Sequence, residues 1–243
     1  MLKAITFDFW NTLYPPLGDD RGISVAELRA EVLRDFLKEK GKNINMEQAH
    51  AAYERAEEFL FNHWRTDFRY SGPEKALEDI ASSLELTLTE QDSVDLTERF
   101  RFRAEVMRIA AFDGVLEMLA TLSERYRLGI ISDTWLTPGA LVREIMEKDD
   151  VLKYFPATVF SDETGFLKPH ASQFQTAVET LGAMTEETLH VGDSERRDVG
   201  GAKALGMMAA LVNWEGETSG SQADFVITDI QQLPEALAAL ADS

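Results

Sequence analysis

Cysteine is absent from the 243-residue chain. The sequence therefore excludes disulfide bonds, thiolate-ligated metal sites and enzymes that use a cysteine nucleophile. The absence of cysteine is compatible with a reducing compartment, and we predict a cytoplasmic protein.

Long apolar runs are also absent. No stretch approaches the roughly 18 apolar residues that a membrane-spanning helix requires. Residues 1–7 are too short for a signal peptide and lack a small-residue cleavage site. We therefore expect no membrane partner, and interpret the N-terminal run as a β-strand.

Basic residues are few relative to acidic ones. The chain has 24 Lys and Arg against 43 Asp and Glu, a formal net charge of −19. Non-specific binding to nucleic acid is disfavoured because it depends on neutralising phosphates with basic side chains, and anionic membrane surfaces are disfavoured for the same reason. We expect no nucleic-acid partner. A small anionic substrate needs local positive charge or a bound cation in order to approach such a chain.

The hydrophobic pattern divides the chain into three parts. Residues 3–7 form a β-branched and aromatic run that ends at Asp8. From about residue 24 to 109 the pattern is helical, with start signals for four helices and no convincing strand. These start signals lie at Ser24, Asn45, Pro73 and Thr89.

After Asp113, apolar strands alternate with amphipathic helices, which is typical of a parallel, doubly wound α/β sheet. The expected strands cover residues 128–131, 157–160, 189–191, 208–212 and 225–227. No second strand follows residues 3–7 directly, so the helical block reads as an insertion. We predict a Rossmann-like α/β core formed by residues 1–15 and 110–243, with an all-helical cap at residues 16–109.

Polar residues follow four of the predicted apolar runs. In doubly wound sheets, sites form at the carboxyl ends of the strands. Each group alone has an ordinary structural explanation, since an Asp at a strand end is more often a turn or helix cap than a nucleophile. Together and in this order they predict a catalytic site. The four groups are Asp8-Phe9-Trp10-Asn11-Thr12, Ser132-Asp133, Lys168-Pro169, and Gly192-Asp193 with Asp198.

These four groups resemble the four motifs of the haloacid dehalogenase (HAD) superfamily, most of whose members are phosphatases. The resemblance covers the whole chain, and the helical insertion is similar to the C1 cap of that family. It implies a HAD-like fold and a hydrolase that transfers a phosphoryl group from a small phosphorylated metabolite to Asp8. Aspartate is a suitable nucleophile because an acyl phosphate splits the hydrolysis into two steps.

The resemblance also implies roles for the other residues. Ser132 and Lys168 are expected to be catalytic and to bind the phosphoryl oxygens, together with backbone N–H groups near Phe9 and Asp133. Lys168 is also expected to lower the pKa of Asp8 through its charge. Mg²⁺ suits a site rich in carboxylate oxygens. Its expected ligands are Asp8, the backbone carbonyl of Trp10, Asp193 and Asp198.

Trp10 departs from the family pattern. Most phosphatases of the family have a second Asp at this position, which protonates the leaving oxygen and later activates water. Trp10 can do neither, so two alternatives stay open: a metal-independent 2-haloacid dehalogenase, and a HAD-fold binding or regulatory protein with vestigial activity. The metal-binding form of the last motif, Gly192-Asp193 with Asp198, favours the phosphatase. Asp133 is a candidate replacement acid, although a turn role explains it equally well.

Other residues carry weaker expectations. A dehalogenase would take an arginine from its cap for the substrate carboxylate, and Arg21 and Arg65 are the candidates. His170 is expected to cap a helix, and His190 to be packed inside its strand. Thr12 is expected to stabilise the turn after Asp8. Three cap side chains at helical spacing are expected in the core: Phe59, Phe100 and Met107.

Overall fold

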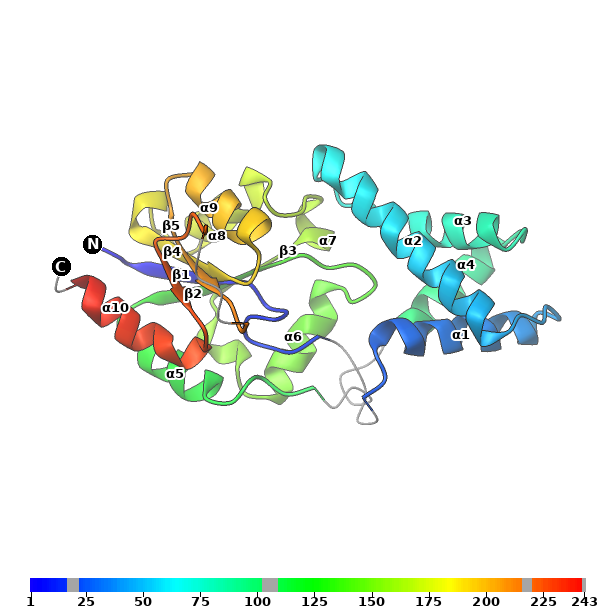
Figure 1. Ribbon diagram of the computed structural model, residues 1–243, viewed down its shortest axis with the longest axis horizontal. Coiled ribbons are helices and arrows are strands. Elements are labelled where there is room, and N and C mark those ends of the chain that lie inside the picture. Colours follow the sequence, from blue (N-terminus) through cyan, green and yellow to red (C-terminus); the bar gives the residue numbers. More distant parts are fainter. Residues whose placement is uncertain (17–21, 102–108, 216–219, 242–243) are drawn as a thin grey trace.

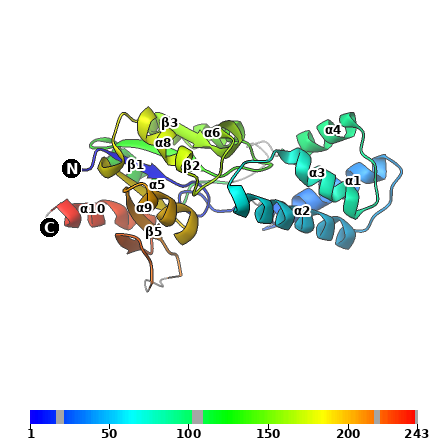
Figure 2. The same ribbon diagram turned by 90° about the horizontal axis from the view of Figure 1, so that it is seen from above.

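The computed structural model describes residues 1–16, 22–101, 109–215 and 220–241. The described chain forms two lobes, one built around a β-sheet and one built of helices alone (Figure 1). The lobes remain side by side when the molecule is turned by 90° (Figure 2). The helical lobe is inserted between the first strand and the remaining strands of the sheet.

Six parallel strands form the sheet, in the order β3-β2-β1-β4-β5-β6. They are β1 (Ala4–Phe7), β2 (Arg127–Ser132), β3 (Ala157–Phe160), β4 (Thr188–Gly192), β5 (Met208–Val212) and β6 (Phe225–Ile227). All four residues of β1 are buried, as expected of a parallel strand covered on both faces. Because β1 pairs with both β2 and β4, the start of the chain lies in the middle of the sheet.

Helices cover both faces of this sheet. They are α5 (Val115–Ser123), α6 (Gly139–Lys148), α8 (Ala171–Thr180), α9 (Gly200–Ala204) and α10 (Leu233–Ala241). Ile130 packs in the cluster that holds the apolar faces of α5, α6 and α10. The next residue, Ile131, packs with α8 and α9, because successive side chains of a strand point to opposite faces. The predicted doubly wound α/β fold is confirmed.

Five short helical segments were not predicted from the sequence. They are Leu152–Tyr154, α7 (Ser161–Thr164), Thr185–Glu187, the π-helix Glu195–Val199 and Ile230–Gln232. The π-helix directly precedes α9, so helical structure in this segment begins at Glu195. A single wide turn of this kind has no apolar repeat, so periodicity does not reveal it.

The helical lobe consists of α1 (Val25–Glu39), α2 (Met46–Asp67), α3 (Pro73–Ser83) and α4 (Glu90–Phe100) within the described residues. The capping boxes predicted at Ser24 and Thr89 are present, each hydroxyl accepting from the backbone N–H three residues on. Phe100 is fully buried, as predicted, whereas Met107 lies outside the described residues.

The prediction that Phe59 belongs to the core is wrong, because its side chain is 44% exposed. The buried stripe of α2 contains Ala49, Ala52, Tyr53, Ala56 and Leu60, which fall on one face of a helix with 3.6 residues per turn. Phe59 lies beside this stripe, so its helical position directs it away from the core of the lobe.

Backbone and side-chain contacts tie the helical lobe to the sheet lobe. Leu167 N donates to Phe68 O (2.7 Å), and Tyr70 N donates to Gly165 O (3.0 Å). The buried guanidinium of Arg29 donates to the carbonyl of Phe100 within the helical lobe. It also donates to the hydroxyl of Thr137 in the sheet lobe, at 2.9 Å.

No helix among the described residues combines the length and the apolar character that crossing a bilayer requires.

Candidate active site

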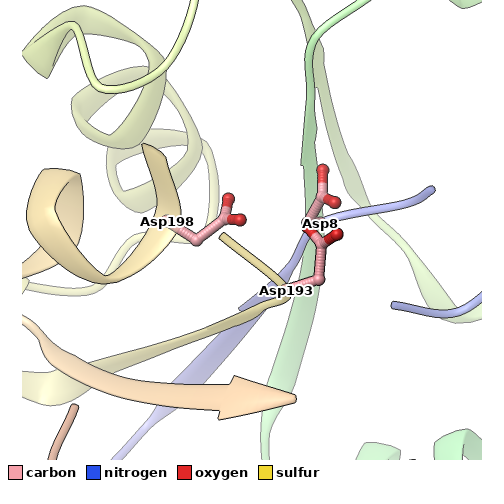
Figure 3. A group of neighbouring side chains, drawn as sticks. All are labelled: Asp8, Asp193 and Asp198. Atoms are coloured by element: carbon pink, nitrogen blue, oxygen red, sulfur yellow. The ribbon is translucent and has the colours of Figure 1, made fainter. Parts of the chain in front are cut away.

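Three carboxylates gather at the carboxyl end of the two central strands (Figure 3). Asp8 directly follows β1 and Asp193 directly follows β4, and these strands are hydrogen-bonded neighbours. Asp8 N donates to Val191 O at 2.9 Å, which continues the pairing of the two strands to Asp8. One oxygen from each of Asp8, Asp193 and Asp198 lies within 4.8 Å of the others. The parallel sheet thus joins residues about 185 positions apart in the sequence.

Asp198 reaches this cluster from the π-helix. Its Oδ2 accepts a hydrogen bond from Ser194 N at 2.9 Å, so the carboxylate is fixed to the turn that presents it. The backbone of Gly192 lies directly against it: a Cβ on Gly192 would be 2.3 Å from Asp198 Cγ. Only glycine leaves room for the carboxylate at this point.

Lys168 lies between two of the carboxylates. Its Nζ is 2.6 Å from Asp8 Oδ1 and 2.6 Å from Asp198 Oδ1, and only 2% of its side chain is exposed. Burial lowers the pKa of Lys168, but the charges of Asp198 and Asp8 outweigh it and the net direction is upward. Lys168 is therefore a fixed ammonium ion at this site.

The pKa of Asp8 is set by opposing influences, of which the expected one, the charge of Lys168, is second in size. The Lys168 charge does lower this pKa, but burial, the largest influence, raises it, and the neighbouring Asp198 and Asp193 raise it further. The net pKa is above the ordinary value of an aspartate. For Asp198, burial also raises the pKa, yet Lys168 and His190 together hold it below its usual range. Two acids with opposite shifts therefore share one ammonium group.

The donor set fits a hard divalent cation. Asp193 Oδ1 is buried and accepts no hydrogen bond within the described residues. Leaving a buried carboxylate oxygen without a partner is costly, and a cation relieves that cost. All three nearby groups offer oxygen ligands, which Mg²⁺ prefers. The residues present suit Mg²⁺ better than Zn²⁺, because no cysteine is available.

The loop after β1 explains two sequence features. Asn11 has φ 58°, a left-handed conformation that asparagine tolerates better than other non-glycine residues. The ring of Trp10 packs edge-on against buried Phe9, with centroids 4.6 Å apart. The hydroxyl of Thr12 donates to Asp8 Oδ2 at 3.5 Å, a contact that spans the turn this threonine was expected to stabilise. The same contact holds the Asp8 side chain.

Ser132 and Asp133 follow β2. Ser132 is buried, and its hydroxyl lies 3.5 Å from the Asp133 carbonyl. The Asp133 side chain accepts from Lys168 N through Oδ1 at 2.9 Å, so it holds the segment that carries the lysine. Burial raises the pKa of Asp133 to about 6, against the lowering influence of Lys168 and Arg197. Asp133 thus combines the expected structural role with a pKa close to neutrality.

The two histidines behave differently. His170 caps α8 as predicted, its Nδ1 accepting from Ser172 N. His190 is fully buried, as predicted, but it also bridges Thr6 Oγ1 (2.9 Å) and Asp198 Oδ1 (3.1 Å). Burial, the largest influence, lowers its pKa. Sequence reasoning missed this link to Asp198; a histidine inside an otherwise apolar strand, two residues before Gly192, was the available signal.

A cavity of about 380 Å³ opens beside Lys168, between the two lobes. The sheet lobe and the helical lobe both contribute to its wall, which includes Phe61, Phe68, Asp133, Leu167, Lys168, Pro169, Ser194, Arg196 and Arg197. Two features of this wall were not expected from the sequence. Phe61 is 44% exposed, and Phe68 has φ 56°, which is unusual for a bulky residue. Of the cap arginines, Arg21 lies outside the described residues, and the structure does not describe the Arg65 side chain.

Comparisons with known proteins agree with the geometry. The family model of haloacid dehalogenase-like hydrolases matches residues 2–206. A glyceraldehyde 3-phosphate phosphatase of Methanothermobacter thermautotrophicus is 29% identical, over 98% of this chain and 100% of that protein.

Two solved structures show the same fold. A 2-haloacid dehalogenase from Pseudomonas syringae pv. tomato has a TM-score of 0.73 at 23% identity, over 99% of this chain and 100% of that one. A HAD phosphatase from Thermococcus onnurineus has a TM-score of 0.67 at 23% identity, over 97% and 98%. One neighbour is a dehalogenase and the other a phosphatase, so fold alone does not distinguish these reactions.

Proposed function

The chain belongs to the haloacid dehalogenase-like hydrolase family, and we propose that it is a Mg²⁺-dependent phosphohydrolase that acts on a small phosphorylated metabolite through an aspartyl-phosphate at Asp8. One observation carries the proposal: the buried cluster of Asp8, Asp193 and Asp198, in which Asp193 Oδ1 has no hydrogen-bond partner among the described residues. Such a cluster needs a cation beyond Lys168, and a cation beside a carboxylate nucleophile is what phosphoryl transfer requires.

Four residues would hold the ion: Asp8, the carbonyl of Trp10, Asp193 and Asp198. When bound, Mg²⁺ neutralises charge on the phosphoryl oxygens and lets an anionic substrate approach a carboxylate. The division into a core of residues 1–15 and 110–243 and a cap of residues 16–109 belongs to the same proposal.

The residues of the chain perform the transfer in two steps. An oxygen of Asp8 attacks phosphorus in line, forming the O–P bond as the bond to the leaving oxygen breaks. Lys168 and Ser132 stabilise the charge on the non-bridging oxygens, assisted by backbone N–H groups near Phe9 and Asp133. Water then attacks the aspartyl-phosphate, and inorganic phosphate leaves with Asp8 restored.

Asp133 is our candidate for the missing proton donor. The position two residues after the nucleophile is Trp10, which cannot supply a proton to the leaving oxygen. Asp133 lines the cavity beside Lys168, and burial raises its pKa to about 6, so a useful fraction carries a proton near neutral pH. Oδ1 is used by Lys168 N, which leaves Oδ2 as the oxygen that can bear the proton.

A metal-independent dehalogenase is the alternative, and the charge balance of the cluster argues against it. Without a metal, three buried or partly buried acids would share the single ammonium of Lys168. The name of the relative from M. thermautotrophicus, a phosphatase, also supports a phosphorylated substrate.

A p-nitrophenyl phosphate assay with and without Mg²⁺ tests the proposal. We expect release that depends on Mg²⁺ and is lowered at least roughly 10³-fold in Asp8→Asn, because the nucleophile is lost. Asp113→Asn, which makes the same change at an exposed acid, is the matched control and should keep full activity. Release that survives chelation of the metal, or that is equal in Asp8→Asn, would sink the phosphatase. Slow release with intact Mg²⁺ binding would favour a regulatory protein.

A further inference from the structure

The cavity beside Lys168 carries positive charge in a strongly acidic chain. Among the described residues, its wall holds three cationic side chains, Lys168, Arg196 and Arg197, against one acid, Asp133. The chain as a whole has a net charge of −19. The ammonium of Lys168 is already engaged by Asp8 and Asp198. The two arginines are therefore the positive charges of this wall that the carboxylates of Asp8 and Asp198 do not engage.

Arg196 forms no ion pair with any of the described residues. Its contact there is with the ring of Phe68, whose centroid lies 5.8 Å from the guanidinium carbon. A guanidinium over an aromatic face keeps its N–H groups available at the ring edge. In a chain with so many carboxylates, an arginine that lines a cavity and pairs with none of the described ones is placed to meet an anion from outside.

Arg197 is held in place but not saturated. Its Nε lies 3.4 Å from Ser194 Oγ, and its terminal nitrogen is 3.8 Å from Asp133 Oδ2, beyond hydrogen-bond distance. Its side chain is 43% exposed. The fork of N–H groups thus has an orientation set by the protein and donors left for a ligand.

The volume of the cavity limits the size of that ligand. Phe61 and Phe68 come from the helical lobe and line the same cavity as the arginines. The left-handed backbone of Phe68 (φ 56°) is costly for such a residue and persists because neighbouring contacts impose it. One of these contacts is the hydrogen bond from Leu167 N to Phe68 O. A volume of about 380 Å³ between these walls suits a compact organic group and not a polymer.

We propose that Arg196 and Arg197 select phosphate monoesters whose leaving group carries a second anionic group, a carboxylate or a second phosphate. The inference rests on the proposed function, since it assigns the far end of the substrate of that same site. The phosphoryl group lies at Asp8 and Lys168, and the second anion lies against the two guanidinium groups. Planar arginine forks bind both kinds of anion through paired hydrogen bonds.

Three phosphate esters with a two-carbon chain test this assignment. The second anion is a carboxylate in 2-phosphoglycolate and a phosphate in ethylene glycol bisphosphate, and ethyl phosphate has none. We expect the wild-type kcat/KM to be higher for 2-phosphoglycolate, for ethylene glycol bisphosphate or for both than for ethyl phosphate. Arg196→Gln and Arg197→Gln should each reduce that preference about 10- to 100-fold, as expected for a charged hydrogen bond. The ester whose kcat/KM falls more in these variants identifies the second anion as a carboxylate or a phosphate.

Three further variants separate recognition from folding. Arg196→Lys and Arg197→Lys keep the charge and should retain part of the preference. Arg125→Gln removes an exposed arginine before β2, at the far end of the sheet, and should leave the preference unchanged. Circular dichroism and thermal melts check that each variant is folded.

The outcomes distinguish a failure of the arginine assignment from a failure of the proposed function. If wild type hydrolyses ethyl phosphate and p-nitrophenyl phosphate but both Gln variants keep the wild-type preference, the arginine assignment is overturned while the phosphohydrolase stands. If wild type with Mg²⁺ hydrolyses no phosphate ester, the proposed function itself fails.

Discussion

The two sides of the active-site region differ in origin and in character. The carboxylate side is buried and comes from the ends of neighbouring strands, at Asp8 and Asp193, together with Asp198 of the following turn. The cavity side is more exposed and combines Phe68 of the helical lobe with Arg196 of the sheet lobe. A rigid sheet edge is suited to hold reacting groups, whereas an inserted lobe can vary its wall without disturbing them. We therefore expect substitutions on the carboxylate side to affect every substrate, and those on the cavity side to act selectively.

The largest effect is expected from Asp193→Asn. Removing one carboxylate from the cluster should weaken Mg²⁺ binding and lower kcat/KM for every phosphate ester by roughly 10³-fold. A second readout is independent of turnover: Mg²⁺ should raise the melting temperature of wild type, because a ligand of the native state stabilises it. This shift should shrink in Asp193→Asn and persist in Asp113→Asn. Equal Mg²⁺ shifts in all three proteins would contradict a metal role for Asp193.

Asp133→Asn has the next largest expected effect. Asp133 lines the cavity and also accepts from the backbone N–H of Lys168, so it links the two sides. For ethyl phosphate, whose alkoxide needs a proton to leave, we expect kcat to fall about 10²-fold, the lower end of the range for a general acid. For p-nitrophenyl phosphate the loss should be much smaller, since its phenolate leaves without a proton. Equal losses for the two substrates would mean that Asp133 only holds the Lys168 segment through the backbone N–H of that residue.

The pH dependence of the rate with ethyl phosphate tests the same role of Asp133. A proton donor must be protonated, and burial raises the pKa of Asp133 to about 6. With ethyl phosphate, the activity that depends on Asp133 should therefore be full below pH 6 and fall as the pH rises through 6. Asp133→Asn should lack this descending limb. A wild-type profile that stays flat across pH 5–8 counts against the assignment.

The sequence predicts the carboxylate side of the active-site region better than the cavity side. The fold and the positions at strand ends were predictable, because apolar runs and the residues after them are local features of the chain. The π-helix and the exposure of Phe59 were not, since one depends on a single turn and the other on which face of α2 meets its neighbours.

The cavity wall was less predictable still. The strained backbone of Phe68 and the position of Arg196 over its ring arise only when the two lobes pack together. No repeat or spacing in the sequence encodes a contact between residues so far apart. The link from His190 to Asp198 is an intermediate case, because the polar residue was visible in its strand but its partner was not.

Gly192→Ala should have a moderate effect that begins with stability. The new Cβ would lie 2.3 Å from Asp198 Cγ, so the buried carboxylate must move. Overpacking of this kind costs about 1–3 kcal/mol, which corresponds to roughly 2–4 °C in Tm per kcal/mol for a chain of this size. Gly200→Ala is the matched control, since its Cβ would meet only the Glu195 carbonyl at 3.4 Å. A Gly192→Ala protein that melts like wild type would show that Asp198 is not tightly confined.

The smallest effect is expected from Trp10→Asp, which places a carboxylate two residues after the nucleophile. If Asp133 already protonates the leaving oxygen, this change should alter kcat for ethyl phosphate by less than about tenfold, the lower bound of a well-placed acid being about 10². Introduced into Asp133→Asn, the same substitution should restore much of the lost activity, because the site would then have a donor again. A large gain in the wild-type background would instead mean that Trp10 limits the natural enzyme and that Asp133 does not act as its acid. The pair of measurements thus decides whether the proton reaches the leaving oxygen from the cavity wall or does not reach it at all.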